Sequence, residues 1–94
     1  SRSEIAKQQI SSIKNSAISF SASRIYTEIK ISNLDGWYFI GSFKNSDKCK
    51  NGCMCLCSTE KCISEYDVCE VSQILMETSY YLINNNYLIK LGKK

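Results

Sequence analysis

Apolar residues recur every three or four positions along the first twenty residues of the chain. The recurring positions are Ala6, Ile10, Ile13, Ala17 and Phe20. This spacing places the five side chains on one stripe of a helix. Ser3 is a candidate N-cap, because its hydroxyl can accept a hydrogen bond from a backbone N–H of the first turn. The pattern predicts a helix from Glu4 to about Phe20 that packs through this stripe.

The helical pattern loses its phase near Phe20, and two interpretations follow. A second stripe, rotated by about 120° from the first, would be formed by Ile18, Ala22, Ile25 and Ile29. One straight helix cannot bury both stripes against one partner. Alternatively the helix ends here and a half-buried strand follows, in which polar residues alternate with Ile25, Thr27, Ile29 and Ile31. We favour the strand because it is rich in β-branched residues.

A second strand is predicted after the turn-forming sequence Asn-Leu-Asp-Gly at residues 33–36. The strand covers residues 37–43, and one of its faces would carry Trp37, Phe39, Gly41 and Phe43. We expect it to form a hairpin with residues 24–32. Trp37, the only tryptophan, is expected to anchor the core because its neighbours are apolar.

The C-terminal part of the chain predicts two more strands, at residues 78–83 and 87–91, joined by three asparagines at 84–86. Asparagine tolerates the left-handed backbone that a tight turn needs. The pattern of residues 70–77 allows either a short helix or a strand, and it fits the helix better. Together these elements predict the α+β class: an N-terminal helix packed on a small antiparallel β-sheet, with a disulfide-stapled loop lobe.

All six cysteines lie within one stretch, at Cys49, Cys53, Cys55, Cys57, Cys62 and Cys69. The middle three alternate with Met54 and Leu56, so a strand would place their sulfurs on one face. Same-face neighbours lie about 6.5–7 Å apart at Cα, at or beyond the limit for an unstrained disulfide. We therefore expect each of the three to pair outward, which leaves about six of the 15 connectivities. The Asn-Gly turn at 51–52 would return Cys49 towards the strand.

Two chemistries suit these cysteines. Three disulfides would stabilise a small exported chain. The alternative is an intracellular zinc or iron–sulfur site with four thiolate ligands, Cys53, Cys55, Cys57 and Cys62. The chain has no histidine and no pair of Cys-x2-Cys knuckles, so we favour disulfides and expect no cofactor. A redox-active pair is a third option, although it lacks the usual Cys-x2-Cys signature.

Composition excludes several function classes. The net charge is +3 and no basic run is interleaved with aromatics, so we expect no nucleic-acid partner. Without histidine there is no Ser–His–Asp or Cys–His arrangement, and the four scattered glycines form no phosphate loop. The carboxylates of Glu65, Asp67 and Glu70 lack the glycine and ligand order of a calcium loop. We conclude that the chain is not an enzyme.

We interpret residues 1–94 as a single domain, with a helix at 1–22 and a sheet with a cysteine-rich lobe at 23–94. The sequence has no signal peptide and no apolar run long enough to span a bilayer. If the cysteines are oxidised, an upstream segment has been removed, and the helix can double as a stalk leading from a lost anchor. Membrane contact is expected only through that anchor.

A helix followed by Gly36-Trp37-Tyr38 and by cysteines ending in Cys55-Leu56-Cys57 resembles small membrane-tethered ectodomains of archaeal surface proteins. At the level of the fold, the chain resembles the globular part of type IV pilin-like subunits, although it lacks their apolar N-terminal segment. The resemblance implies a secreted or cell-surface location. We predict a non-enzymatic extracytoplasmic structural or binding module with a protein partner. The alternatives are the metal-binding module and, more weakly, a secreted inhibitor or toxin-like factor.

Overall fold

The computed structural model describes residues 1–44, 49–71 and 79–93, and begins with a long helix, α1, at Arg2–Ser23. All five residues of the predicted stripe are buried, which confirms the helical pattern. The Ser3 cap is wrong: the side chain of Ser1 accepts the hydrogen bond from the Glu4 backbone N–H. Arg24 caps the C-terminal end of the helix: it has a φ of 60° and donates its backbone N–H to the Phe20 carbonyl.

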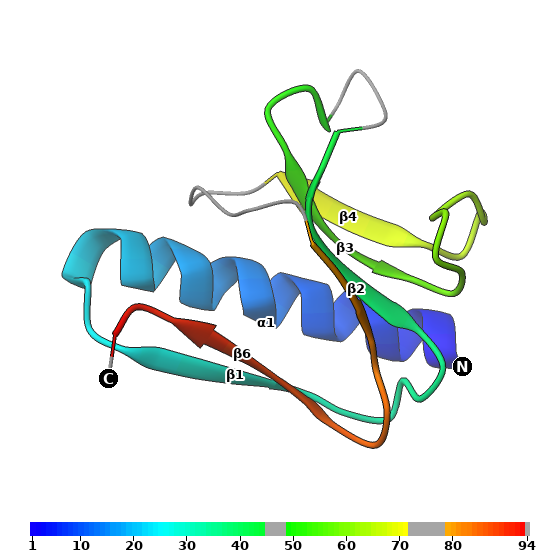
Figure 1. Cartoon of the computed structure of the whole chain (residues 1–94), viewed down its shortest axis with the longest axis horizontal. Coiled ribbons are helices and arrows are strands. Elements are labelled where there is room, and N and C mark those ends of the chain that lie inside the picture. Colours follow the sequence, from blue (N-terminus) through cyan, green and yellow to red (C-terminus); the bar gives the residue numbers. More distant parts are fainter. Residues whose placement is uncertain (45–48, 72–78, 94) are drawn as a thin grey trace.

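Six strands follow within the described ranges, and all their pairings are antiparallel (Figure 1). They are β1 (Thr27–Ile31), β2 (Tyr38–Phe43), β3 (Cys53–Cys57), β4 (Val68–Val71), β5 (Ser79–Leu82) and β6 (Tyr87–Leu91). A four-stranded sheet has the order β4-β3-β2-β5, and β1 pairs with β6 in a two-stranded sheet. The α+β prediction is confirmed.

The predicted hairpin between residues 24–32 and 37–43 is wrong. β1 pairs with β6, with Thr27 opposite Leu91, whereas β2 pairs with β3 and β5. A turn does form, since the Trp37 N–H donates to the Leu34 carbonyl. The turn buries Leu34 in the core and carries the chain from one sheet into the other, so it does not fold the chain back on β1.

The asparagine-rich link at 84–86 also carries the chain from one sheet into the other. Asn85 has a φ of 63°, which confirms the expected left-handed backbone. However, β5 and β6 belong to different sheets and do not pair with each other. The stretch from β1 to β2 and the stretch from β5 to β6 therefore each contribute one strand to each sheet. They run antiparallel to each other along their length, and Figure 1 shows them as two long neighbouring traces. Of the ambiguous residues 70–77, 70 and 71 belong to β4, and the rest lie outside the described residues.

The main core lies between α1 and the inner faces of both sheets. The helix stripe packs there with residues of β1, β2, β3, β4 and β6 and of the links, among them Ile31, Phe39, Leu56 and Ile89. Trp37 is buried in this cluster, which confirms its predicted role as a core anchor. The side chain of Gln9 accepts a hydrogen bond from the Ser32 backbone N–H at 2.9 Å and so ties α1 to the end of β1.

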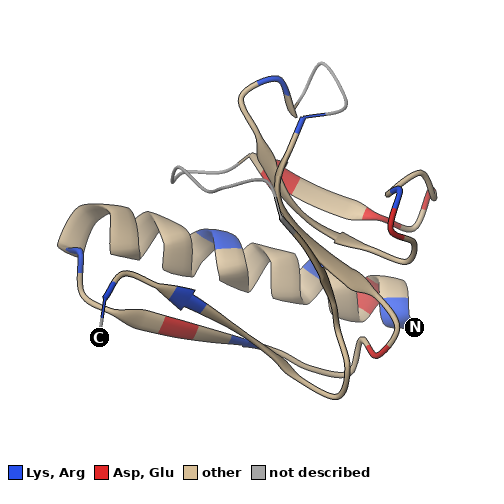
Figure 2. Cartoon of the chain, viewed as in Figure 1, with Lys and Arg blue, Asp and Glu red and all other residues tan. Residues whose placement is uncertain are grey.

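In the part of the chain that the structure describes, charged residues of both signs are distributed over the helix, both sheets and the loops (Figure 2). Lys14 of α1 and Glu70 of β4 form an ion pair with an N–O distance of 3.2 Å. Glu70 lies opposite the inward-facing Met54, so this ion pair lies on the helix side of the sheet. No helix in the described part of the chain is long and apolar enough to cross a membrane.

Candidate functional site

β3 is the central feature of the cysteine-rich region, and all five of its residues are buried. Met54 and Leu56 face α1, whereas Cys53, Cys55 and Cys57 lie on the opposite, outer face of the four-stranded sheet. This confirms the predicted alternation of sulfur and apolar side chains. The sequence CMCLC therefore contributes to two cores at once, one on each face of the sheet.

The six cysteines form three disulfides: Cys49–Cys53, Cys55–Cys69 and Cys57–Cys62. No cysteine is free. Each cysteine of β3 pairs outward, as the strand geometry requires. Cα–Cα separations are 5.2, 4.1 and 5.1 Å respectively. Three intramolecular disulfides are typical of extracytoplasmic proteins.

Each disulfide holds a different neighbour of β3. The first closes the turn before the strand, where Gly52 donates its N–H to the Cys49 carbonyl. This confirms the turn predicted at residues 51–52. The second joins β3 to the directly opposed residue of β4. The third holds the loop of residues 58–67 at the end of β3. Together with Ile40, the cystines form a second buried cluster on the outer face.

Asp67 closes the loop of residues 58–67. One of its carboxylate oxygens accepts from the backbone N–H and the hydroxyl of Ser58, at 2.7 and 3.0 Å. The other accepts from the backbone N–H of Ser64 at 2.8 Å. The sequence argued against a calcium role for this carboxylate but did not indicate its structural role. Asp67 binds the loop and Glu70 binds Lys14, so these two carboxylates face different partners.

β2 contains an irregularity that sequence reasoning also missed. Its register against β3 shifts between Ile40 and Phe43, and Ser42 between them has a φ of 57°. The predicted placement of Phe43 on the same face as Phe39 is therefore wrong. Phe39 joins the core against α1, whereas Phe43 packs against the cystine cluster on the outer face. The Gly41-Ser42 dipeptide is the local signal that could have indicated a bulge.

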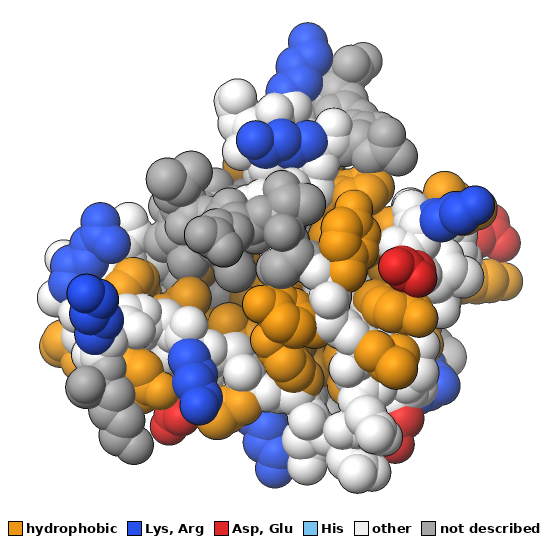
Figure 3. All heavy atoms as spheres, in the orientation of Figure 1, with side chains coloured by type: hydrophobic (Ala, Val, Ile, Leu, Met, Phe, Trp, Pro, Cys, Tyr) orange, Lys and Arg blue, Asp and Glu red, His pale blue; other side chains and the backbone are white. Residues whose placement is uncertain are grey.

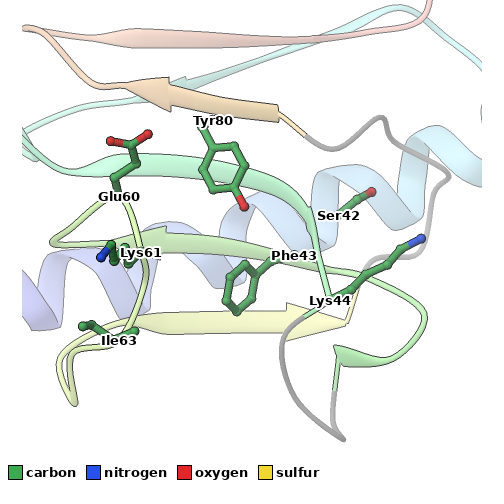
Figure 4. Close-up of a pocket in the computed structure, with 7 residues that line it drawn as sticks. All are labelled: Ser42, Phe43, Lys44, Glu60, Lys61, Ile63 and Tyr80. Carbon is green, nitrogen blue, oxygen red and sulfur yellow. The ribbon is translucent and has the colours of Figure 1, made fainter.

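A hollow of about 750 Å³ opens on the outer face beside this bulge. It is lined by Ser42, Phe43, Lys44, Glu60, Lys61, Ile63 and Tyr80. Figure 4 shows the rings of Phe43 and Tyr80 near the middle, with Lys44 and Lys61 on opposite sides. The only salt bridges formed within the described ranges are Ser1–Glu4 and Lys14–Glu70, so neither lysine of the hollow is in an ion pair.

Exposed apolar side chains extend this surface beyond the hollow. Tyr80 is 50% exposed, Leu82 is 57% exposed and Ile63, at the rim, is 75% exposed. Figure 3 shows hydrophobic side chains at the surface over the region of β2 and β5. We define the outer face as the cystine cluster, the hollow and these exposed residues. An exposed apolar surface with a polar rim is typical of an interaction site.

Two groups of candidate metal ligands lie close together in the cysteine-rich region. The sulfurs of Cys55, Cys62 and Cys69 lie within 4.8 Å of one another, as do the donor atoms of Cys57, Cys62 and Asp67. Cys53 belongs to neither group, so the four predicted zinc ligands are not brought together as one set within the part of the chain described here. A metal would need thiolates, whereas these sulfurs are disulfide-bonded.

The aromatic pair Tyr81–Tyr87 lies on the other side of the sheet. The two rings stack with centroids 4.9 Å apart. Burial, and secondarily the neighbouring Tyr81, raises the pKa of Tyr87 to about 12. Tyr87 is therefore a neutral phenol at neutral pH and has a packing role.

Comparisons with protein-family models, with curated proteins and with solved structures give no match. The resemblance to archaeal surface ectodomains and to pilin-like subunits therefore stays a prediction.

Proposed function

We propose that the chain is a non-enzymatic extracytoplasmic module that binds a protein partner through the outer face of its four-stranded sheet. The observation that carries this proposal is that all three disulfides lie beneath or beside the exposed apolar residues of that face. Cross-links concentrated at one surface are a reason to assign that surface a role in addition to stability.

The physical benefit of the disulfides is rigidity. Association costs conformational entropy for every loop that must become ordered on binding. The loop of residues 58–67 carries Ile63, Lys61 and Glu60 to the hollow, and it is held both by Cys57–Cys62 and by Asp67. A loop that is ordered before binding presents these side chains at a lower entropic cost.

The non-enzymatic part of the proposal is supported by the charged groups around the hollow. Lys44, Glu60 and Lys61 are all exposed to water. Catalytic groups are typically held in sites from which water is excluded. The hollow instead combines apolar side chains with a solvated charged rim, as protein-binding surfaces do.

The finer form of the proposal is the ectodomain of an anchored, pilin-like surface protein. It is supported by α1, which lies along both sheets and begins at one end of the molecule (Figure 1), with Ser1 exposed. An anchor joined upstream of Ser1 would leave the body there without crossing either sheet. A free secreted form would present the same outer face.

The second candidate is an intracellular metal-binding module, and one observation favours it. Three sulfurs, those of Cys55, Cys62 and Cys69, lie close enough together to share an ion if they were reduced. In this alternative the disulfides are replaced by metal–thiolate bonds, and the fold depends on the metal.

Intact mass spectrometry on protein isolated without reductant tests the first proposal against the second. Three disulfides predict a mass about 6 Da below that of the fully reduced chain. Thiol alkylation under denaturing conditions should then label no cysteine, and a chelator should leave the unfolding temperature unchanged. Six alkylated cysteines, or stoichiometric zinc or iron lost together with the fold, would overturn the proposal in favour of the metal module.

A further inference from the structure

β5 is an edge strand of the four-stranded sheet. Within residues 1–44, 49–71 and 79–93 it pairs with β2 alone. Edge strands are commonly protected from further pairing by charged residues, prolines or bulges. β1, β4 and β6, the other edge strands, each carry charge: Glu28 and Lys30, Glu70, and Lys90. β5 reads Ser-Tyr-Tyr-Leu, without a charge, and is uniformly tan in Figure 2.

The backbone of β5 has hydrogen-bonding groups that point away from β2. Ile83, directly after the strand, donates its N–H to the Trp37 carbonyl at 2.8 Å and accepts from the Gly36 N–H at 2.9 Å. Because these groups alternate along an antiparallel strand, Tyr81 also faces β2. The N–H and C=O groups of Tyr80 and Leu82 therefore point to the open edge.

The side chains at this edge would favour an added strand. Tyr80 and Leu82 lie opposite Ile40 and Tyr38, on the outer face, and each is at least half exposed. An incoming strand would place alternate side chains beside them, in cross-strand contact. Tyr80 also lines the hollow, so the edge is continuous with the rim that carries Lys44 and Lys61.

We infer that the β5 edge binds an extended, acidic peptide segment of a partner protein, which adds a fifth strand to the sheet. This inference rests on the proposed binding function and specifies the partner's chemistry. The backbone of the peptide pairs with Tyr80 and Leu82, as in other cases of strand addition. Its acidic side chains meet Lys44 and Lys61 of the rim, which form no ion pair with the residues that the structure describes.

A second copy of this chain fits the edge less well. It would bring the same lysines and the same net charge of +3 to the contact. The four residues of β5 span only about 13 Å, so pairing two such strands would bury far less than the roughly 1,200 Å² of a stable interface. A peptide can instead continue from the edge across the hollow.

Amide hydrogen exchange in the free protein tests the open edge directly. We expect slow exchange at the amides of Tyr81 and Ile83 and fast exchange at those of Tyr80 and Leu82. Protection of the Tyr80 and Leu82 amides that is the same at all protein concentrations would show that the chain itself already covers the edge. That result would overturn the inference. Protection that increases with protein concentration would identify a second copy as the occupant.

The binding probe is a blocked peptide of alternating valine and threonine with a glutamate at each end. It should protect the amides of Tyr80 and Leu82, and added salt should weaken its binding. N-methylation of the probe at alternate residues removes the donors that face β5 and should lower affinity about tenfold, the effect of losing one or two hydrogen bonds. Replacing the terminal glutamates by lysine should also weaken binding. Equal affinity for all three peptides would contradict strand addition.

Matched proline variants test the same geometry from the protein side. Proline is tolerated in a strand where the lost N–H would face solvent. Leu82→Pro should therefore keep a cooperative unfolding transition and bind the probe about tenfold more weakly. Tyr81→Pro should abolish the cooperative unfolding transition, because the N–H of Tyr81 faces β2. If the protein has three disulfides but does not bind the probe, strand addition at β5 is refuted while the proposed function stands. The proposed function is tested separately, by the oxidation state of the cysteines.

Discussion

At the scale of single residues, Asp67 shows how one carboxylate can hold a loop. Its oxygens accept from Ser58, at the end of β3, and from Ser64, within the loop. The loop also carries Cys62 and the hollow residue Ile63. The position of the rim therefore depends on a residue that does not itself line the hollow.

Asp67→Ala should destabilise the protein by about 1–3 kcal/mol, because it leaves partly buried backbone N–H groups of Ser58 and Ser64 without their acceptor. Urea denaturation measures the change. Glu65→Ala in the same loop is the matched control and should alter stability by less than about 0.5 kcal/mol, since Glu65 is exposed. Equal effects of the two substitutions would contradict the role assigned to Asp67.

Tyr87 predicts how stability responds to alkaline pH. Its pKa is raised from 10.0 to about 12 in the folded protein. The folded state therefore holds the phenol proton where the unfolded state has lost it, and stability falls as pH rises from about 10 to about 12. Tyr87→Phe should make this part of the stability profile flatter. An unchanged alkaline slope in denaturant titrations of the variant would contradict the prediction.

At the scale of elements, the disulfides differ in the length of chain that they close. Cys55–Cys69 joins two neighbouring strands and spans a sequence separation of 14, whereas Cys49–Cys53 spans only 4. A disulfide constrains the unfolded chain more when it closes a longer loop. The β3–β4 disulfide should therefore contribute more to the free energy of unfolding.

Replacing both Cys55 and Cys69 by alanine should cost about 3 kcal/mol, and the same change at Cys49 and Cys53 about 2 kcal/mol, from loop-closure entropy. Alanine avoids a buried hydroxyl at these positions. Each double variant should have a mass about 4 Da below that of its own fully reduced chain, and this difference verifies that the other two disulfides persist. The reverse order of stability in guanidinium titrations would refute the assignment.

Elements were predictable from local patterns, but their pairing was not. The stripe of α1 and the alternation of β3 repeat within a few residues, so the sequence predicts both. The partner of β1 is β6, at the far end of the chain, and no local turn signal indicates it. Phe43 changes face because of a bulge, and Asp67 acts through the folded shape of its loop. The outer face depends on this bulge and on this loop and therefore required the structure.

At the scale of the whole molecule, the C-terminal end of the chain lies against the last turn of α1. A Cβ placed on Gly92, just after β6, would lie 2.7 Å from Cε1 of Phe20, near the end of the helix. Phe20 is itself buried in the core. Gly92 thus allows the C-terminal end of the chain to lie directly against the helix.

Gly92→Ala should destabilise the protein by about 2–4 kcal/mol, the sum of a left-handed backbone penalty and a steric contact. Gly36→Ala is the control, because Gly36 has a similar φ of +84° but open space around its Cβ position. That variant should cost about 1–2 kcal/mol, from the backbone alone. Thermal unfolding compares the two, and equal losses would show that the contact with Phe20 contributes nothing.

The pairing of β1 with β6 also has a consequence for the order of events during synthesis. Thr27 lies opposite Leu91, so this ladder cannot form until Leu91 has been synthesised. Contacts between such distant residues slow folding, because a long loop must first be closed. The cystines join residues that are near in sequence and can form earlier. A nascent chain would thus acquire its cross-links while its first and last strands are still apart.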